Sequence, residues 1–300
     1  MKKILITGAN GLLGQKLMSH YHNHPDVKTI ATGINKSRLG NRSYAYHTMD
    51  ITSEDEVKKV IAEVSPDVII NTAALTQVDQ CETEREACWR LNVTAVDHLI
   101  KASEENNCFL LHLSTDFIFD GAAGPYKEDD KPNPVSYYGE SKVASEKLLE
   151  NSKIAYAIAR AQLVYGIVPN LGRSNIILWV KKSLEEGKEI KVVNDQWRTP
   201  TLAEDLAKGC ASIAEKEAKG IFHLSGEEML SPYDMAIATA DFFDLDKSLI
   251  HKVDSSTFTQ PAKRPQKTGF ILEKAKQELG YQPVSFLEGL ALLKSQLTDV

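Results

Sequence analysis

The chain has 300 residues, 42% of them hydrophobic, which is enough to bury a sizeable core without disulfide bonds. Its net charge of −6 and the lack of a basic stripe argue against nucleic acid as a partner. The sequence shows neither a signal peptide nor a long apolar run, so we expect no membrane partner and a cytoplasmic location.

The first predicted strand, residues 2–7, runs directly into a glycine-rich turn. Three glycines recur at three-residue spacing, so the backbone N–H groups of the turn and the start of the next helix can meet a pyrophosphate. The last glycine permits close packing of helix against strand. We therefore predict a dinucleotide site that includes Gly8, Asn10, Gly11, Leu12, Leu13 and Gly14.

Candidate metal ligands follow this helix but lack partners. His20, His22 and His24 alternate just before Pro25, and no acidic or cysteine residue has ligand spacing around them. The four cysteines form no C-x-x-C pair and are expected to be reduced thiols. We expect no metal site.

The second predicted strand, residues 29–33, lacks the acidic residue that usually binds the 2′-hydroxyl of NAD at its end. Lys36 and Arg38 follow instead, and their cations could meet a 2′-phosphate. This pattern favours NADP, with NADPH preferred and NADH still able to bind. The alternative is that both are ordinary solvated charges.

Two further segments lie where a cofactor could be contacted. Asp50 and Ile51 follow the third strand, where Asp50 could face the adenine or equally start the next helix, residues 53–64. The strand at residues 68–72 is followed by small side chains that let a backbone approach a cofactor closely. These cofactor candidates are Thr72, Ala73 and Ala74.

A helix over residues 84–105 and a strand over residues 109–114 lead to the residues that carry the chemistry. Thr115 and Asp116 end the apolar run of that strand, and Tyr138 and Lys142 follow four residues apart on one helix face. A cation near Tyr138 would bias its phenol towards proton exchange at neutral pH. The alternative is an aromatic core residue beside a solvated lysine.

The alternation of strands and helices, continued by a strand over residues 155–160, predicts an α/β fold with a doubly wound parallel sheet of Rossmann type. Beyond it we expect helices over residues 175–186, 203–216, 233–243 and 286–297. Residues 1–162 are expected to form the dinucleotide-binding domain. Residues 163–300 are expected to form mainly a smaller substrate-binding lobe, with some segments returning to the first domain.

These motifs resemble the extended short-chain dehydrogenase/reductases and, within them, the dTDP-4-dehydrorhamnose reductase family. The resemblance spans essentially the whole chain. Besides the glycine turn and the Tyr138/Lys142 pair, it rests on residues 71–79, 91–93, 114–121, 194–196, 200–201 and 264–265.

The resemblance implies hydride transfer from a reduced nicotinamide to the C4 carbonyl of a nucleotide-linked 4-keto-6-deoxy sugar. It implies that Tyr138 protonates the developing alkoxide, that Lys142 holds the nicotinamide ribose and biases Tyr138, and that Thr115 orients the substrate oxygen. A nucleotide-sugar cleft between the lobes would include Thr76, Val78 and Asp116.

One departure from the family concerns Arg198, which stands where many relatives have a small residue. Its guanidinium could bind a diphosphate or a sugar hydroxyl, so we expect it to contact substrate. The alternative is a surface ion pair.

Three other functions share these motifs. A sugar-nucleotide 4,6-dehydratase commonly has Asp-Glu after the threonine, whereas this chain has Asp116 and Phe117. A nucleotide-sugar epimerase can use the same tyrosine. A non-catalytic regulatory subunit of the methionine adenosyltransferase type can retain the cofactor motifs. Homodimer formation is left open.

Overall fold

The computed structural model describes residues 1–39, 44–170 and 174–297, and its central feature is a parallel sheet of seven strands. The strands follow the order β10-β6-β5-β4-β1-β2-β3, and every neighbouring pair is parallel. This confirms the doubly wound α/β fold. The strands are β1 (Lys2–Thr7), β2 (Val27–Gly33), β3 (Ala45–Thr48), β4 (Val68–Asn71), β5 (Phe109–Thr115), β6 (Tyr156–Ala161) and β10 (Gly220–His223).

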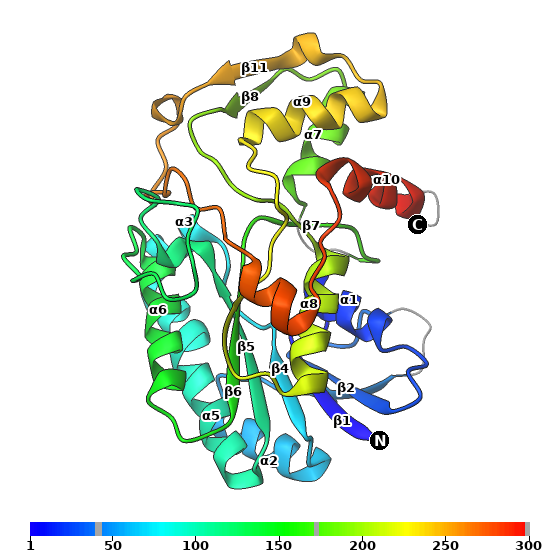
Figure 1. Cartoon of the computed structure of the whole chain (residues 1–300), viewed down its shortest axis with the longest axis vertical. Coiled ribbons are helices and arrows are strands. Elements are labelled where there is room, and N and C mark those ends of the chain that lie inside the picture. Colours follow the sequence, from blue (N-terminus) through cyan, green and yellow to red (C-terminus); the bar gives the residue numbers. More distant parts are fainter. Residues whose placement is uncertain (40–43, 171–173, 298–300) are drawn as a thin grey trace.

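Helices cover both faces of the sheet, which explains why its central strands are apolar throughout (Figure 1). In β1, Ile4 and Ile6 pack with Leu17 on one face, while Leu5 packs with Val57 on the other. Helices α1 (Leu12–His20) and α8 (Ala203–Lys216) supply the first face, and α2 (Glu54–Val64), α5 (Ala95–Asn106) and α6 (Tyr137–Glu150) supply the second.

The helix predicted over residues 84–105 is present as one continuous run, from α4 (Arg85–Trp89) through a π-helical segment, η1 (Arg90–Thr94), into α5. The π-helical segment and a separate short helix before the run, α3 (Val78–Thr83), were not predicted. Asn92 in the π segment binds the backbone of Leu75 through both its amide oxygen and its nitrogen. The irregularity therefore anchors the loop that follows β4.

The C-terminal half forms a smaller lobe above the carboxyl ends of the strands (Figure 1). Asn175 caps α7, and Ser231 caps α9 in a capping box with Pro232 at the first helical position. The lobe contains α7 (Ile176–Glu185), α9 (Pro232–Phe243), α10 (Phe286–Leu297), β7 (Val164–Tyr165), β8 (Ile190–Val193), β9 (Thr201–Leu202), β11 (Ile250–Val253) and two 3-10 turns, η3 (Lys247–Leu249) and η4 (Ser255–Thr257). The π segment η5 (Ala275–Leu279) packs with α8 in the core of the large sheet instead.

The C-terminal half also contributes to the large sheet. β10 pairs with β6, and α8 packs on the same sheet face as α1. Among the described residues, no helix combines the length and the apolar character that a membrane span requires.

Candidate active site

The strand order reverses between β1 and β4, so a crevice is expected at their carboxyl ends. Gly8 follows β1 with φ of +63°, and a Cβ placed on it would lie 2.9 Å from both the Ala73 nitrogen and the Thr72 hydroxyl. A Cβ on Gly14 would lie 2.5 Å from the Gly8 carbonyl oxygen. These positions need glycine because backbone segments meet there.

Helix α1 starts immediately after this turn. Its N-cap is Gly11, which has no side chain to bind the free N–H groups of the first turn, and no acidic residue lies in that turn. Leu12 and Leu13 open the helix, so their N–H groups point out of its positive end. The turn fits the diphosphate of a dinucleotide in shape and charge.

The predicted 2′-phosphate site lies beside this turn. The side chain of Asn10 accepts a hydrogen bond from the Arg38 nitrogen at 2.8 Å and donates one to the Lys36 carbonyl at 3.1 Å. Both cationic side chains are exposed. Asn10 thus holds the segment after β2 against the glycine turn, and residues 40–43 lie outside the described residues.

The acidic candidate after β3 has a structural partner. The Asp50 carboxylate accepts hydrogen bonds of 2.8 Å from both the nitrogen and the hydroxyl of Thr52. The side chain of Ile51 is buried, and its carbonyl contacts His98. Asp50 therefore forms the turn before α2, and an adenine contact for it or for Ile51 stays a prediction.

The structure brings Tyr138 and Lys142 together with Thr115. Ser136 caps α6, so the helix begins at the carboxyl end of β5 and both side chains lie buried there, 8% and 2% exposed. Burial raises the pKa of Tyr138, and its hydrogen bond with Thr115 only partly offsets this. The phenol therefore keeps its proton in the neutral range, as a proton donor must.

Lys142 has partners that the sequence did not indicate. Its ammonium nitrogen lies 2.7 Å from the Leu113 carbonyl and 3.0 Å from Nε2 of His112. Burial lowers the pKa of Lys142 to about 8. Burial and the Lys142 charge hold the pKa of His112 well below its usual range, so the imidazole is neutral. His112 also contacts Asn71 at 3.1 Å.

Asp116 and Arg198 form a buried ion pair, with 3.4 Å between Oδ2 of Asp116 and Nε of Arg198. We expected Arg198 to contact substrate, so this pairing differs from the prediction. Arg198 is 5% exposed, and its guanidinium donates to the carbonyls of Trp197, Pro265 and Gln266. The reason is local: the guanidinium satisfies carbonyl groups that a loop buries. Arg198 positions the cleft wall in this structure.

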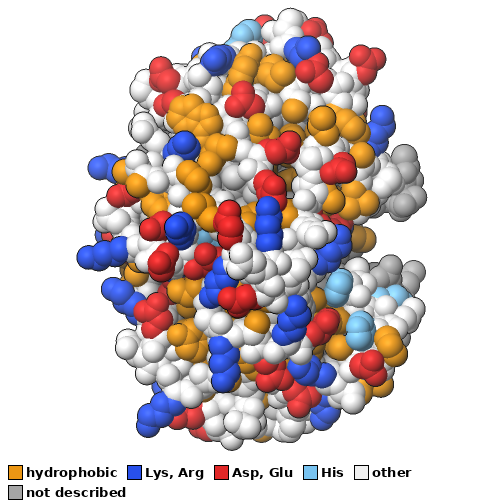
Figure 2. Space-filling view, in the orientation of Figure 1, with side chains coloured by type: hydrophobic (Ala, Val, Ile, Leu, Met, Phe, Trp, Pro, Cys, Tyr) orange, Lys and Arg blue, Asp and Glu red, His pale blue; other side chains and the backbone are white. Residues whose placement is uncertain are grey.

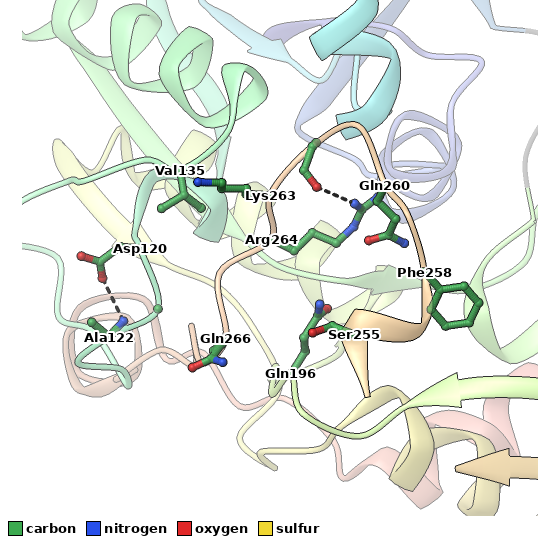
Figure 3. A pocket seen from close by; sticks show the side chains of 12 residues that line it. Asp120, Ala122, Val135, Gln196, Ser255, Phe258, Gln260, Lys263, Arg264 and Gln266 are labelled. Carbon is green, nitrogen blue, oxygen red and sulfur yellow. Dashed lines mark hydrogen bonds between the residues drawn. The ribbon is translucent and has the colours of Figure 1, made fainter. Parts of the chain in front are cut away.

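An open cavity of about 410 Å³ lies beside that wall (Figure 3). Arg264 projects along it and binds Asp79 of α3 at 2.7 Å, while Lys263 points towards Val135, just before α6. Sequence reasoning included Arg264 only as part of a motif and missed Lys263. The cavity is lined by Asp120, Gly121, Ala122, Val135, Gln196, Ser255, Phe258, Gln260, Ala262, Lys263, Arg264 and Gln266.

The predicted substrate residues Thr76 and Val78 lie on either side of Gln77, the N-cap of α3. Thr76 is exposed and Val78 is half-buried. The Asp79 carboxylate that follows them binds both the nitrogen of Ala262 and the Arg264 side chain. The segment after β4 is therefore tied directly to the cavity wall. Ala74, the remaining cofactor candidate, is half-buried in the same segment.

On the face in Figure 2, basic and acidic side chains are interspersed. Within the described residues, no three His, Cys, Asp or Glu side chains are grouped as metal ligands would be.

Comparison with known proteins places this fold and site in a family. A model described as the RmlD substrate binding domain matches residues 1–298. The chain belongs to the RmlD substrate binding domain family. A dTDP-4-dehydrorhamnose reductase of Aggregatibacter actinomycetemcomitans is 33% identical in an alignment that covers 98% of this chain and 99% of that protein.

Two further relatives of this RmlD-family chain bear on function. The methionine adenosyltransferase 2 subunit beta of Bos taurus is 32% identical over 270 residues, covering 88% of this chain and 79% of that protein. A solved dTDP-4-dehydrorhamnose reductase of Bacillus anthracis, in complex with NADP, is 28% identical with a TM-score of 0.84 and covers 99% of this chain and 100% of that one.

Proposed function

We propose that this protein is an NADPH-dependent oxidoreductase that reduces the C4 carbonyl of a nucleotide-linked 4-keto-6-deoxy sugar, with dTDP-4-dehydrorhamnose as its substrate. The observation that carries the proposal is the 33% identity to a dTDP-4-dehydrorhamnose reductase over nearly the full length of both chains. The grouping of Thr115, Tyr138 and Lys142 at the carboxyl end of β5 supports it.

The roles of these residues follow from their chemistry. A bound nicotinamide supplies the hydride. Tyr138 donates its phenolic proton to the alkoxide oxygen that forms at C4, and the Thr115 hydroxyl orients that oxygen beforehand. Lys142 binds the nicotinamide ribose, for which its ammonium must move from the buried contacts with His112 and Leu113. Substrate oxygen and phenol are thus held within reach of each other.

NADP is the cofactor in this proposal. The glycine turn and α1 bind the diphosphate, and Lys36 and Arg38 bind the 2′-phosphate. Asn10 fixes the backbone of residues 36–38 beside the glycine turn, which supports this assignment. The NADP complex of the Bacillus anthracis relative supports it as well.

The nucleotide sugar would occupy the cleft between the sheet and the lobe. Lys263 and Arg264 bring two cations to the cavity wall, where a diphosphate can bind. Thr76 and Val78 face the sugar from the α3 side. We keep residues 1–162 as the cofactor domain and 163–300 as mainly the substrate lobe, and we include a cytoplasmic location and homodimer formation in the proposal.

The proposal is tested with a panel of 4-keto nucleotide sugars, with NADPH oxidation followed by its absorbance. We expect net oxidation with dTDP-4-dehydrorhamnose and a slower reaction when the nucleotide is changed. An epimerase would convert the sugar without net NADPH consumption. Absence of NADPH oxidation with every sugar of the panel would contradict the reductase assignment.

A second candidate is a regulatory subunit of the methionine adenosyltransferase type. It is favoured by the 32% identity to the bovine subunit beta over 88% of this chain. Gel filtration of the purified protein mixed with a methionine adenosyltransferase catalytic subunit separates the two functions. A stable complex, together with no turnover of any sugar, would favour the binding role.

A further inference from the structure

Two cysteines lie directly behind the tyrosine that the proposed reaction uses. Cys81 of α3 and Cys88 of α4 are both fully buried and form one apolar cluster with Tyr138. Both sulfurs border one pair of polar groups: the Cys81 sulfur lies 3.6 Å from the Leu75 carbonyl, and the Asn92 amide donates both to that carbonyl and to the Cys88 sulfur. The two other cysteines, Cys108 and Cys210, belong to the main sheet core on other elements.

Polar groups surround one member of the pair. The Asn92 amide donates to the Cys88 sulfur at 3.4 Å, and the Cys88 sulfur lies 3.5 Å from the hydroxyl of Ser141, the residue before Lys142. The thiol of Cys81, these two polar groups and the Lys142 charge lower the pKa of Cys88. The same contact with Cys88, together with burial, raises the pKa of Cys81. One sulfur is therefore favoured as thiolate and the other as thiol.

We propose that Cys81 and Cys88 form a peroxide-sensitive thiol pair whose disulfide closes directly behind Tyr138. The Cys88 thiolate attacks one oxygen of a peroxide, which breaks the O–O bond and leaves a sulfenic acid on Cys88. The Cys81 sulfur then attacks the Cys88 sulfur, so that the S–S bond forms and water leaves. The two thiols lose two electrons, and the peroxide gains them.

One of the elements that cover the pair is short. α3 has six residues and is tied to the cavity wall by the Asp79–Arg264 ion pair, whereas α4 runs on into η1 and α5. A short helix such as α3 opens locally more readily than a sheet core does, which gives a small peroxide access. Cys108 and Cys210 are buried in the sheet core instead.

The disulfide would change the site because it shortens the distance between the two sulfurs. The two sulfurs of this cluster must approach to about 2 Å to form the bond, so α3 and α4 must move together. The Cys81 sulfur contacts the Leu75 carbonyl at 3.6 Å, and Leu75 is the residue before Thr76. The movement therefore reaches both the packing of Tyr138 and the substrate segment. Its effect on turnover rests on the proposed reductase function, whereas the bond itself does not.

The test treats the full-length protein with hydrogen peroxide and digests it with trypsin without reduction. Trypsin cuts after Arg85, so the disulfide links two separate peptides, one of them Glu86 to Arg90. We expect this linked pair, a turnover reduced on the order of 10- to 100-fold, and recovery with dithiothreitol. Cys81→Ser and Cys88→Ser should each abolish the link, while the matched variants Cys108→Ser and Cys210→Ser should retain it.

The outcomes separate this proposal from the reductase assignment. Absence of the linked peptides in the unmodified protein overturns the thiol pair, and a linked protein with unchanged turnover overturns its effect on the site. If no sugar is reduced, the reductase assignment fails, and the linked peptides still decide whether the thiol pair forms. If one serine variant fails to fold, the other and the unmodified protein suffice.

Discussion

Tyr138 is buried beside Thr115, and this defines what the loss of its hydroxyl should do. Burial raises the pKa of Tyr138, so the phenol keeps its proton in the neutral range. Tyr138→Phe keeps the ring and removes the proton. We expect turnover to fall by roughly 10² to 10⁴, with NADPH affinity nearly unchanged. Steady-state rates with NADPH titration check both, and unchanged turnover would rule out Tyr138 as the acid.

The lowered pKa of Lys142 predicts that NADPH affinity depends on pH. Burial lowers its pKa to about 8, and the ammonium is the form that can bind ribose hydroxyls. NADPH affinity should therefore be highest below pH 8 and should decline as pH rises through that value, by at most about tenfold per pH unit. Fluorescence titration across this range measures the decline.

The control for this prediction is Lys142→Met, which should bind NADPH more weakly and without the decline. If the decline persists in Lys142→Met, another group causes it.

His112 lies 3.0 Å from the Lys142 amine, yet the sequence indicated only the spacing between Tyr138 and Lys142. Spacing of four residues reveals a shared helix face, but it cannot reveal which strand residue faces it.

At the scale of elements, the segment after β2 carries the cofactor preference. Asn10 holds the backbone of residues 36–38 beside the glycine turn, so Lys36 and Arg38 can act together on one phosphate. Replacing both by alanine should reduce the preference for NADPH over NADH by roughly tenfold to hundredfold. Dissociation constants for both cofactors measure it. Equal affinities in the unmodified protein would refute the assignment.

The packing of α1 on β1 depends on Gly14. A Cβ there would lie 2.5 Å from the Gly8 carbonyl and 2.6 Å from the Ala9 Cα, both of which are backbone atoms. Gly14→Ala should therefore lower the free energy of unfolding by about 1–3 kcal/mol, measured by urea denaturation. Gly11→Ala is the matched control, because its Cβ would meet its nearest neighbour only at 3.2 Å. Equal losses in both variants would refute this explanation.

The elements predicted most accurately were those with a local signature. β1 and α8 have the predicted bounds because an apolar run and a helical repeat each end abruptly in the sequence. β10 was not predicted, since four residues of a strand, Gly220–His223, carry too little pattern by themselves. Its strand identity comes from pairing with β6, and that contact is distant in sequence.

At the scale of the whole molecule, Arg198 joins the two halves of the chain. It pairs with Asp116 at the end of the sheet and holds the carbonyls of residues 265–266 in the lobe. Arg198→Ala should lower the free energy of unfolding by about 3–5 kcal/mol, because it leaves the buried Asp116 carboxylate without its cation, with only the hydroxyls of Thr115 and Thr268 as partners. Arg198→Lys should recover part of the loss, since it keeps the charge without the fork. Thermal unfolding measures the series.

This prediction also separates the two roles weighed for Arg198. If both variants keep their stability and instead raise the Michaelis constant for the sugar, Arg198 contacts substrate after all. Burial of a charged side chain under a loop could not be inferred from the sequence, where an arginine beside Trp197 is indistinguishable from a surface arginine.

The pairing of β10 with β6 also has a consequence for synthesis on the ribosome. When residues 1–161 have emerged, β6 presents an open edge, and the sheet face that α8 will cover is still bare. The face can be covered only when α8 has been made, as far as Lys216, and the edge can be paired only when β10 has been made, as far as His223. The nascent protein therefore exposes an apolar sheet face and an unpaired strand edge while residues 162–223 are being synthesised. We expect chaperone binding to be strongest during that interval.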